Sequence, residues 1–167
     1  KMGFGVVTTV QGRGVIAEDH PMSIGAYNLQ PAIESFFQTC DAMLVVGSRL
    51  RSNETLKYQL KLPQPLLRID ADPMANGRCY RSAQFVCGDA ALTLDALADK
   101  LEGRMKIDKA FAADLRRAHA SAVASLRDGL GPYASLVDAV QAEAGTRFNW
   151  VRDVTVSNST WGNRELR

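Results

Sequence analysis

Three short apolar runs constrain the fold of this chain more than any other feature. They occupy residues 42–47 (AMLVVG), 65–70 (PLLRID) and 83–88 (AQFVCG), each of strand length. The first is apolar throughout, which is typical of a strand covered on both faces of a parallel sheet. A fourth, β-branched run at residues 4–9 predicts another buried strand.

Helical patterns separate these runs. Residues 31–40 start with a proline that suits a first helical turn, and residues 48–62 predict a polar loop and then a helix. Asp89 is placed to cap the next helix. The apolar stripe of that helix consists of Leu92, Leu94, Leu97, Ala98 and Leu101. Alternating strands and helices predict an α/β fold, a Rossmann-like parallel sheet with flanking helices and right-handed crossovers.

The pattern changes after residue 102. A charged, alanine-rich helix is predicted next, followed by a helix at 132–145 and a strand at 147–156. We therefore expect three units: a Rossmann-like domain at 1–102, a linker helix within 103–131 that runs over a surface, and the start of a second α/β domain at 132–167. Because the chain begins in a strand pattern and stops in a helix pattern, we interpret it as a fragment.

Composition argues against several classes of function. The 167 residues, 46% of them hydrophobic, suit one ordinary core. The net charge is +2 and basic residues are scattered, so we expect no nucleic-acid partner. No apolar run approaches the roughly 18 residues of a membrane span, so we expect no membrane association. Cys40, Cys79 and Cys87 lack metal or disulfide spacing and suit the reducing cytoplasm.

Residues 11–27 (QGRGVIAEDHPMSIGAY) contain a candidate acid–base cluster of His20 with Glu18 and Asp19. A histidine before proline is more often structural, because its backbone is held extended and its ring packs or caps locally. We favour the structural interpretation. His119 lies in a charged helical pattern and is expected to be solvated.

Polar residues at two strand ends form a candidate nucleotide site, because an open parallel sheet presents ligands there. Gly47 would let a backbone approach a phosphate that Arg49 binds, and Asp70 and Asp72 would accept hydrogen bonds from ribose hydroxyls. Neither G-x-G-x-x-G nor G-x-x-x-x-G-K-[ST] is present.

The closing stretch, residues 152–164 (RDVTVSNSTWGNR), suits a turn that holds an anionic diphosphate. The same residues would also make a plain helix N-cap through Ser157, Asn158 or Ser159. The sequence alone leaves these two interpretations open.

Taken in order, four stretches resemble the central domain of thiamine-diphosphate-dependent enzymes of the acetolactate synthase and benzoylformate decarboxylase superfamily. They are VVTTVQGRGVIAEDHPMSIG, CDAMLVVGSRL, LLRIDADP and CGDAALTLDAL, within residues 5–101. The tail from Pro132 is similar to the opening of the family's third, diphosphate-binding domain, where Trp161 matches a common tryptophan.

The resemblance implies a parent enzyme that uses thiamine diphosphate and magnesium (Mg²⁺) to decarboxylate a 2-oxo acid or to join its acyl group to a second substrate. The family's activating glutamate and its G-D-G…N metal motif belong to parts outside these residues; CGDA at 87–90 is not that motif. We therefore expect a scaffold without catalytic residues or metal ligands of its own. Its partners would be the rest of its enzyme and a second subunit, in a homodimer or homotetramer.

The resemblance also assigns candidate cofactor-binding residues. Ser157 and Asn158 match the turn that touches the diphosphate. The strand ends that face FAD or another adenine nucleotide in some members are matched by Gly47, Ser48, Arg49, Asp70 and Asp72. Flavin-containing members carry a Gly-Met-His-Gly-like segment where this chain has residues 26–28 (AYN), and an acidic pair where it has 51–53 (RSN). These departures favour an empty pocket, although Arg51 would also suit an extra phosphate.

The resemblance further implies that a first strand and helix of the central domain are missing here. The competing hypothesis is a non-catalytic Rossmann-like module that binds FAD or ADP. An NAD-binding deacetylase-like fold is a third, for which the glycine fingerprint is absent. The tail separates the first two, since a plain binding module needs no strand and SNSTW turn after a linker helix.

Overall fold

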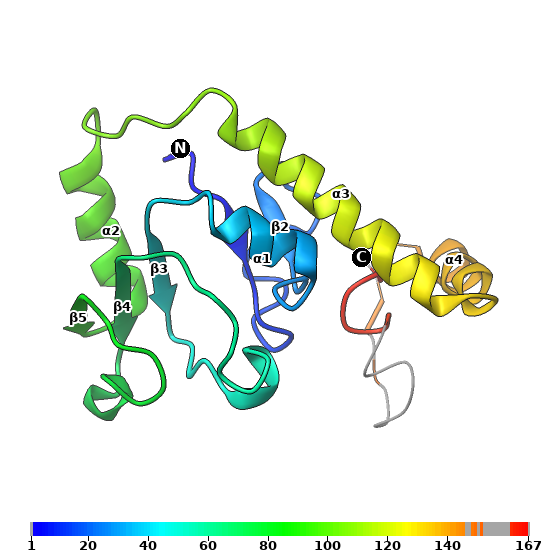
Figure 1. Cartoon of the computed structure of the whole chain (residues 1–167), viewed down its shortest axis with the longest axis horizontal. Helices are drawn as coiled ribbons and strands as arrows, with labels where there is room; N and C mark the ends of the chain where they lie inside the picture. Colours follow the sequence, from blue (N-terminus) through cyan, green and yellow to red (C-terminus); the bar gives the residue numbers. More distant parts are fainter. Residues whose placement is uncertain (1, 146–147, 150, 152–160, 167) are drawn as a thin grey trace.

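The computed structural model describes residues 2–145, 148–149, 151 and 161–166. Most of its strands and helices follow the predicted order, but the strand Ser23–Gly25 was not predicted and residues 48–62 form no α-helix (Figure 1). The elements are β1 Val6–Val7, β2 Ser23–Gly25, α1 Pro31–Phe37, β3 Met43–Val46, β4 Leu66–Asp70, β5 Gln84–Cys87, α2 Ala90–Leu101, α3 Phe111–Leu130 and α4 Tyr133–Ala144, with short 3-10 helices at Ser52–Glu54 and Pro73–Ala75. None of the described helices combines the length and hydropathy needed to cross a bilayer.

All paired strands are parallel, which confirms the predicted α/β class. Their hydrogen bonds nevertheless form two sheets rather than one in the described part of the chain: β1 with β2, and β3 with β4 and β5. In the larger sheet Val45 lies beside Arg68, which lies beside Phe85. Because parallel neighbours run in the same direction, the carboxyl ends of β3, β4 and β5 meet at one edge.

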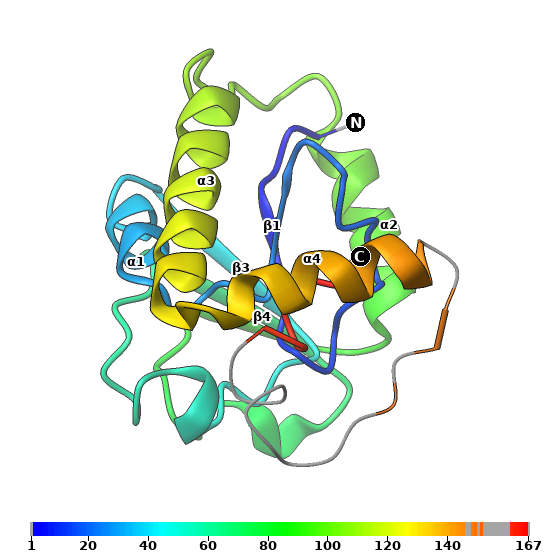
Figure 2. The ribbon, with the colours of Figure 1, turned by 90° about the vertical axis from the view of Figure 1, so that its right-hand side faces the viewer.

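The main core lies between the strands and the pair α1 and α3. Ile33 of α1, Leu66 of β4 and Leu115 of α3 are fully buried in it. Figure 2 shows α3 lying along α1, and the two helices contact each other. A helix is therefore present within 103–131, as expected, and its buried residues Leu115 and Ala122 belong to the main core.

The prediction of a helix within residues 48–62 is wrong. Beyond the short 3-10 turn, Leu56, Lys57 and Tyr58 have φ values of 50°, 56° and 68°, which a right-handed helix cannot contain. Tertiary contacts hold this segment instead. The Asn28 side chain donates to the Glu54 carbonyl at 2.7 Å, and the fully buried Thr55 donates its hydroxyl to the Arg51 carbonyl.

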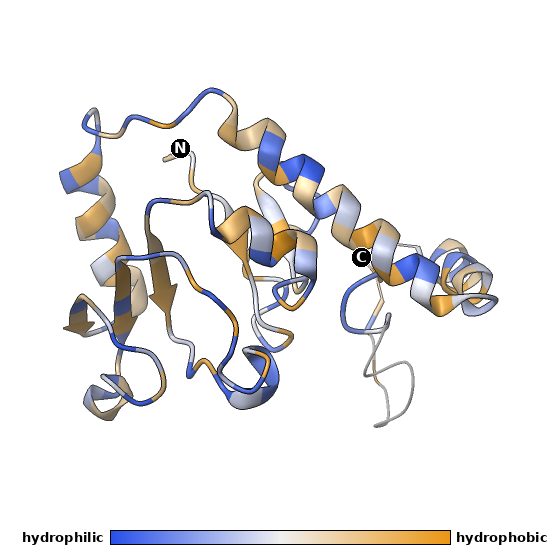
Figure 3. Ribbon diagram, viewed as in Figure 1, coloured by the Kyte–Doolittle hydropathy of each residue, from blue (hydrophilic) through white to orange (hydrophobic). Residues whose placement is uncertain are grey.

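The helix predicted after Asp89 is confirmed as α2. One Asp89 carboxylate oxygen accepts from the Leu92 amide at 3.0 Å, a standard N-cap. Its predicted apolar stripe is not buried, since Leu92 is 73% exposed and no residue of α2 is fully covered. Figure 3 shows apolar residues along α2 next to the apolar strands β4 and β5.

A second cluster joins α4 to the end of the chain. Val137 of α4 packs there with Leu130, Trp161 and Leu166. Residues 161–165 form a hydrogen-bonded turn in which the Arg164 and Glu165 amides donate to the Trp161 carbonyl. Most of the strand predicted at 147–156 lies outside the described residues. His119 is half-buried with its ring 5.1 Å from that of Tyr27, so the expectation of a solvated His119 is wrong.

Candidate functional site

The carboxyl ends of β3, β4 and β5 bring the predicted nucleotide residues together. The Gly47 amide donates to the Ile69 carbonyl at 2.9 Å, and the Gly88 amide donates to the Asp70 carbonyl at 3.0 Å. Three turns, at residues 47–49, 70–72 and 87–89, thus follow directly from neighbouring strands. This is the edge at which an open parallel sheet places ligands.

The turn after β3 is open to solvent. Gly47 has a φ of 60°, which suits glycine, and a Cβ built on it would meet no atom within 4 Å. The Ser48 hydroxyl accepts from the Leu50 amide at 3.2 Å, so it shapes the turn. The side chain of Arg49 is exposed. A ligand could therefore approach the backbone of Gly47, and the Arg49 side chain would supply a positive charge next to it.

The acid that ends β4, Asp70, and the acid two residues later, Asp72, each cap a turn. Asp70 accepts from the Asp72 amide at 3.0 Å, and Asp72 accepts from the Met74 amide at 2.9 Å. Each bond uses one carboxylate oxygen, and a carboxylate offers about four lone-pair sites. Both acids can therefore still accept hydrogen bonds from sugar hydroxyls, so the residues present fit the ribose side of an adenine nucleotide.

The predicted thiamine diphosphate residues, Ser157 and Asn158, lie outside the described residues. The described residues contain no group of three or more histidine, cysteine, aspartate or glutamate side chains placed to hold a metal ion. The fit of this chain to thiamine diphosphate and Mg²⁺ therefore stays a prediction.

The acid–base cluster does not assemble, which confirms the structural interpretation of His20. Its Nδ1 accepts from the Met22 amide at 3.1 Å and so caps the local turn. Glu18 instead pairs with Arg13, whose Nε lies 3.1 Å from a carboxylate oxygen. Asp19 is exposed. His20 and Glu18 thus both have local partners outside the candidate acid–base cluster.

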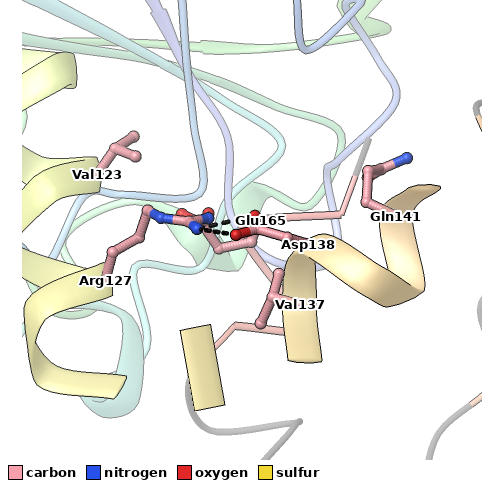
Figure 4. Close-up of a pocket in the computed structure, with 6 residues that line it drawn as sticks. All are labelled: Val123, Arg127, Val137, Asp138, Gln141 and Glu165. Carbon is pink, nitrogen blue, oxygen red and sulfur yellow. Dashed lines mark hydrogen bonds and ion pairs between the residues drawn. The ribbon is translucent and has the colours of Figure 1, made fainter. Parts of the chain in front are cut away.

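The structure adds a charged cluster that the sequence did not reveal (Figure 4). Arg127 of α3 donates to both carboxylate oxygens of Asp138 on α4, at 2.8 and 2.7 Å, and to Glu165 at 3.0 Å. The hydrogen bonds to Asp138 and then Glu165 raise the pKa of Arg127. These residues are far apart in sequence, so no local pattern could have found them.

The same cluster fastens the terminal turn to the loop after β2. The Tyr27 hydroxyl donates to Glu165 at 2.5 Å, and Arg164 Nε donates to the Ala26 carbonyl at 3.0 Å. Burial lowers the pKa of Arg164. The cluster lines a hollow of about 300 Å³ with Val123, Val137 and Gln141. Because Arg127 and Tyr27 already bind its carboxylates, we interpret the cluster as a structural contact that holds α3, α4 and residues 161–166 together.

Comparison with known proteins agrees with this architecture. Residues 1–97 match the family described as thiamine pyrophosphate enzyme, central domain. A probable 2-ketoarginine decarboxylase, AruI, of Pseudomonas aeruginosa is 32% identical over 120 residues, which are 68% of this chain and 22% of that protein. A putative acetolactate synthase large subunit, IlvB2, of Mycobacterium tuberculosis is 34% identical over 104 residues, 58% of this chain and 19% of that protein.

A probable acetolactate synthase large subunit of Methanocaldococcus jannaschii is 31% identical over 88 residues, 51% of this chain and 15% of that protein. The aligned part of this chain thus spans about a fifth or less of the length of these relatives. The family match covers more than half of the chain. The matched residues form parallel strands with flanking helices, the fold class that the sequence predicts. The chain belongs to the thiamine diphosphate enzyme family, and residues 1–97 correspond to the central domain.

Proposed function

We propose that this chain is part of a thiamine-diphosphate-dependent enzyme that acts on a 2-oxo acid, by decarboxylation, by acetolactate synthase-like carboligation, or by both. The match of residues 1–97 to the central domain carries this proposal. The names of two relatives, a 2-ketoarginine decarboxylase and an acetolactate synthase, support the substrate class. The free thiols of Cys40, Cys79 and Cys87 suit a cytoplasmic enzyme.

Within that enzyme the chain acts as a scaffold. Residues 1–102 would be the central domain, a linker helix would lie within 103–131, and residues 132–167 would open the diphosphate-binding domain. When bound, thiamine diphosphate with Mg²⁺ supplies the chemistry at the carbonyl carbon of the 2-oxo acid. Ser157 and Asn158 would bind its diphosphate. The structural role of His20 supports a scaffold, because the one candidate acid–base cluster serves a turn.

The division of the strands into two sheets supports the proposal that this chain pairs with other parts of its enzyme or with a second subunit. Among the described residues, two parallel sheets have more strand edges than one sheet would, and edge strands favour pairing with a further strand. A further strand with its helix would complete the central domain. The whole enzyme would then be a homodimer or homotetramer.

A second candidate function is a non-catalytic module for FAD or ADP. The open backbone at Gly47 and the acceptor capacity of Asp70 and Asp72 favour it. The departures at residues 26–28 and 51–53 oppose a flavin. Both functions can coexist, since the residues assigned to the adenine nucleotide, at 47–49 and 70–72, are not those assigned to thiamine diphosphate, Ser157 and Asn158.

Calorimetric titration of the 167-residue chain separates these candidates. Thiamine diphosphate with Mg²⁺ is expected to give no tight binding, because most of its site belongs elsewhere. Binding of FAD or ADP would make an adenine nucleotide a ligand of this chain. Tight thiamine diphosphate binding by the chain alone would contradict the scaffold role.

The enzyme proposal itself is tested in the full-length parent protein. Release of carbon dioxide from a panel of 2-oxo acids is expected to require thiamine diphosphate and Mg²⁺. The double substitution Ser157→Ala with Asn158→Ala should raise the cofactor concentration that gives half-maximal activity. Activity that needs no thiamine diphosphate would refute the proposal.

A further inference from the structure

The segment at residues 11–27, between β1 and α1, contains none of the residues assigned to a ligand. Three of its groups form hydrogen bonds with residues 164–166, which lie at least 138 positions further along the chain. Contacts that close so long a loop carry an entropic cost, so favourable interactions must offset it. These contacts make residues 161–166, the terminal turn, the structural partner of the 11–27 segment.

Two of these contacts join an arginine to a backbone carbonyl. Arg13 Nη2 donates to the Leu166 carbonyl, and Arg164 Nε donates to the Ala26 carbonyl at 3.0 Å. The donor belongs to the 11–27 segment in the first contact and to the terminal turn in the second. Because hydrogen bonds are directional, two bonds in opposite senses fix the orientation of the turn as well as its position.

The third contact involves a buried carboxylate. Tyr27 is itself buried, and its hydroxyl donates to Glu165 at 2.5 Å. The Glu165 side chain is only 7% exposed and also accepts from Arg127 of α3 at 3.0 Å. A carboxylate with so little exposure depends on its hydrogen-bond and charge partners, so the loss of either partner destabilises the contact.

A further contact holds Arg13 in position. Its Nε lies 3.1 Å from one carboxylate oxygen of Glu18, and both side chains are at most 18% exposed. A Cβ built on Gly25 would stand 2.7 Å from the other oxygen of Glu18, so a glycine here leaves room for the carboxylate. Glu18 therefore keeps the Arg13 guanidinium directed at the terminal turn.

We propose that the 11–27 segment is a docking surface for the terminal turn, and through it for the start of the diphosphate-binding domain. Arg13 and Tyr27 bind the turn, and Glu18 is a positioning residue because it acts through Arg13. The turn also packs on α4, since Trp161 is buried in the apolar cluster to which α4 contributes. The identity of the docked domain rests on the function proposed above, whereas the docking rests on these contacts.

Amide hydrogen exchange of the full 167-residue chain, resolved by NMR, tests this docking. The Arg164 and Glu165 amides donate to the Trp161 carbonyl, so they are protected from exchange until the turn opens. Tyr27→Phe keeps the aromatic ring and removes the hydroxyl. This variant should raise the exchange rates of both amides about tenfold or more, because a hydrogen bond to a charged group is lost.

Glu18→Gln should raise the same two rates, because Arg13 loses the charge that directs it. In a chain that already carries Arg13→Met, Glu18→Gln should have no further effect, since Glu18 acts through Arg13. Tyr133→Phe and Asp19→Asn are the matched controls. Both of these residues are exposed, so both controls should exchange at the wild-type rates.

Unchanged exchange of the Arg164 and Glu165 amides in both Tyr27→Phe and Glu18→Gln would overturn the proposal, because the apolar cluster alone would then hold the turn. A rise confined to the amides of β4 would also overturn it, since the substituted residues would then stabilise the central sheet and not the docked turn. Thiamine diphosphate takes no part in this experiment, so neither result bears on the enzyme proposal.

Discussion

Leu115 offers the sharpest test of how α3 is attached. Its side chain is fully buried, and its Cδ1 lies 2.5 Å from the point where a Cβ on Gly5 would stand. The methyl group therefore fills the space that Gly5 leaves beside β1. Leu115→Ala removes three carbon atoms from this contact, and the backbone on both sides limits collapse around the cavity.

We expect Leu115→Ala to lower the free energy of unfolding by about 3 kcal/mol, as for buried leucines elsewhere. For a chain of this length that corresponds to a fall of about 6–12 °C in melting temperature. Urea denaturation followed by circular dichroism measures the free energy, with an unchanged m-value as the sign of an intact unfolding transition.

Leu136→Ala is the control, because Leu136 of α4 is 47% exposed and should cost less than about 0.5 kcal/mol. Equal, small effects of the two substitutions would refute the reasoning. The helix would then be a surface linker, as the sequence suggested.

Two further predictions concern the charged cluster and the thiols. Arg127→Met should lower the free energy of unfolding by about 1–3 kcal/mol, because it leaves Glu165, 7% exposed, without its cation; an unchanged urea midpoint would contradict this. Burial and then the neighbouring Asp41 charge raise the pKa of the half-buried Cys40 thiol. At pH 8 a thiol reagent should therefore label Cys40 more slowly than the exposed Cys79, and its rate should keep rising at higher pH. Equal rates by mass spectrometry would contradict the burial of Cys40.

Much of the local structure could be predicted from short patterns. Pro31 begins α1, and Asp89 caps α2, because each acts on its own first turn. The apolar run at 42–47 forms the strand β3, although only Val45 of its four residues is buried and the others are half-buried. The turns after β3 and β4 were also placed correctly, since parallel strands carry their following residues to a common edge.

The segment at residues 51–62 shows where such patterns fail. Its polar and apolar spacing suits a helix, but the buried hydroxyl of Thr55 and the bond from Asn28 hold it in a different path. A local pattern does not contain the partner that Asn28 supplies from another element. The arginine within LLRID was visible in the sequence, yet only the structure shows that Arg68 is buried and that its Nη1 has no hydrogen-bond partner among the described residues.

By itself, the sequence determined the fold class, most of the strands and helices, and the family, because these depend on periodicity, caps and motifs that neighbouring residues carry. Only the tertiary structure decided that α3 joins the core, that α2 leaves Leu92 exposed, and that Arg127 meets Asp138 and Glu165. The physical reason is that these interactions act over different distances along the chain. Backbone preferences act within a turn or a strand, whereas burial and charge pairing depend on which distant surfaces meet once the chain has folded.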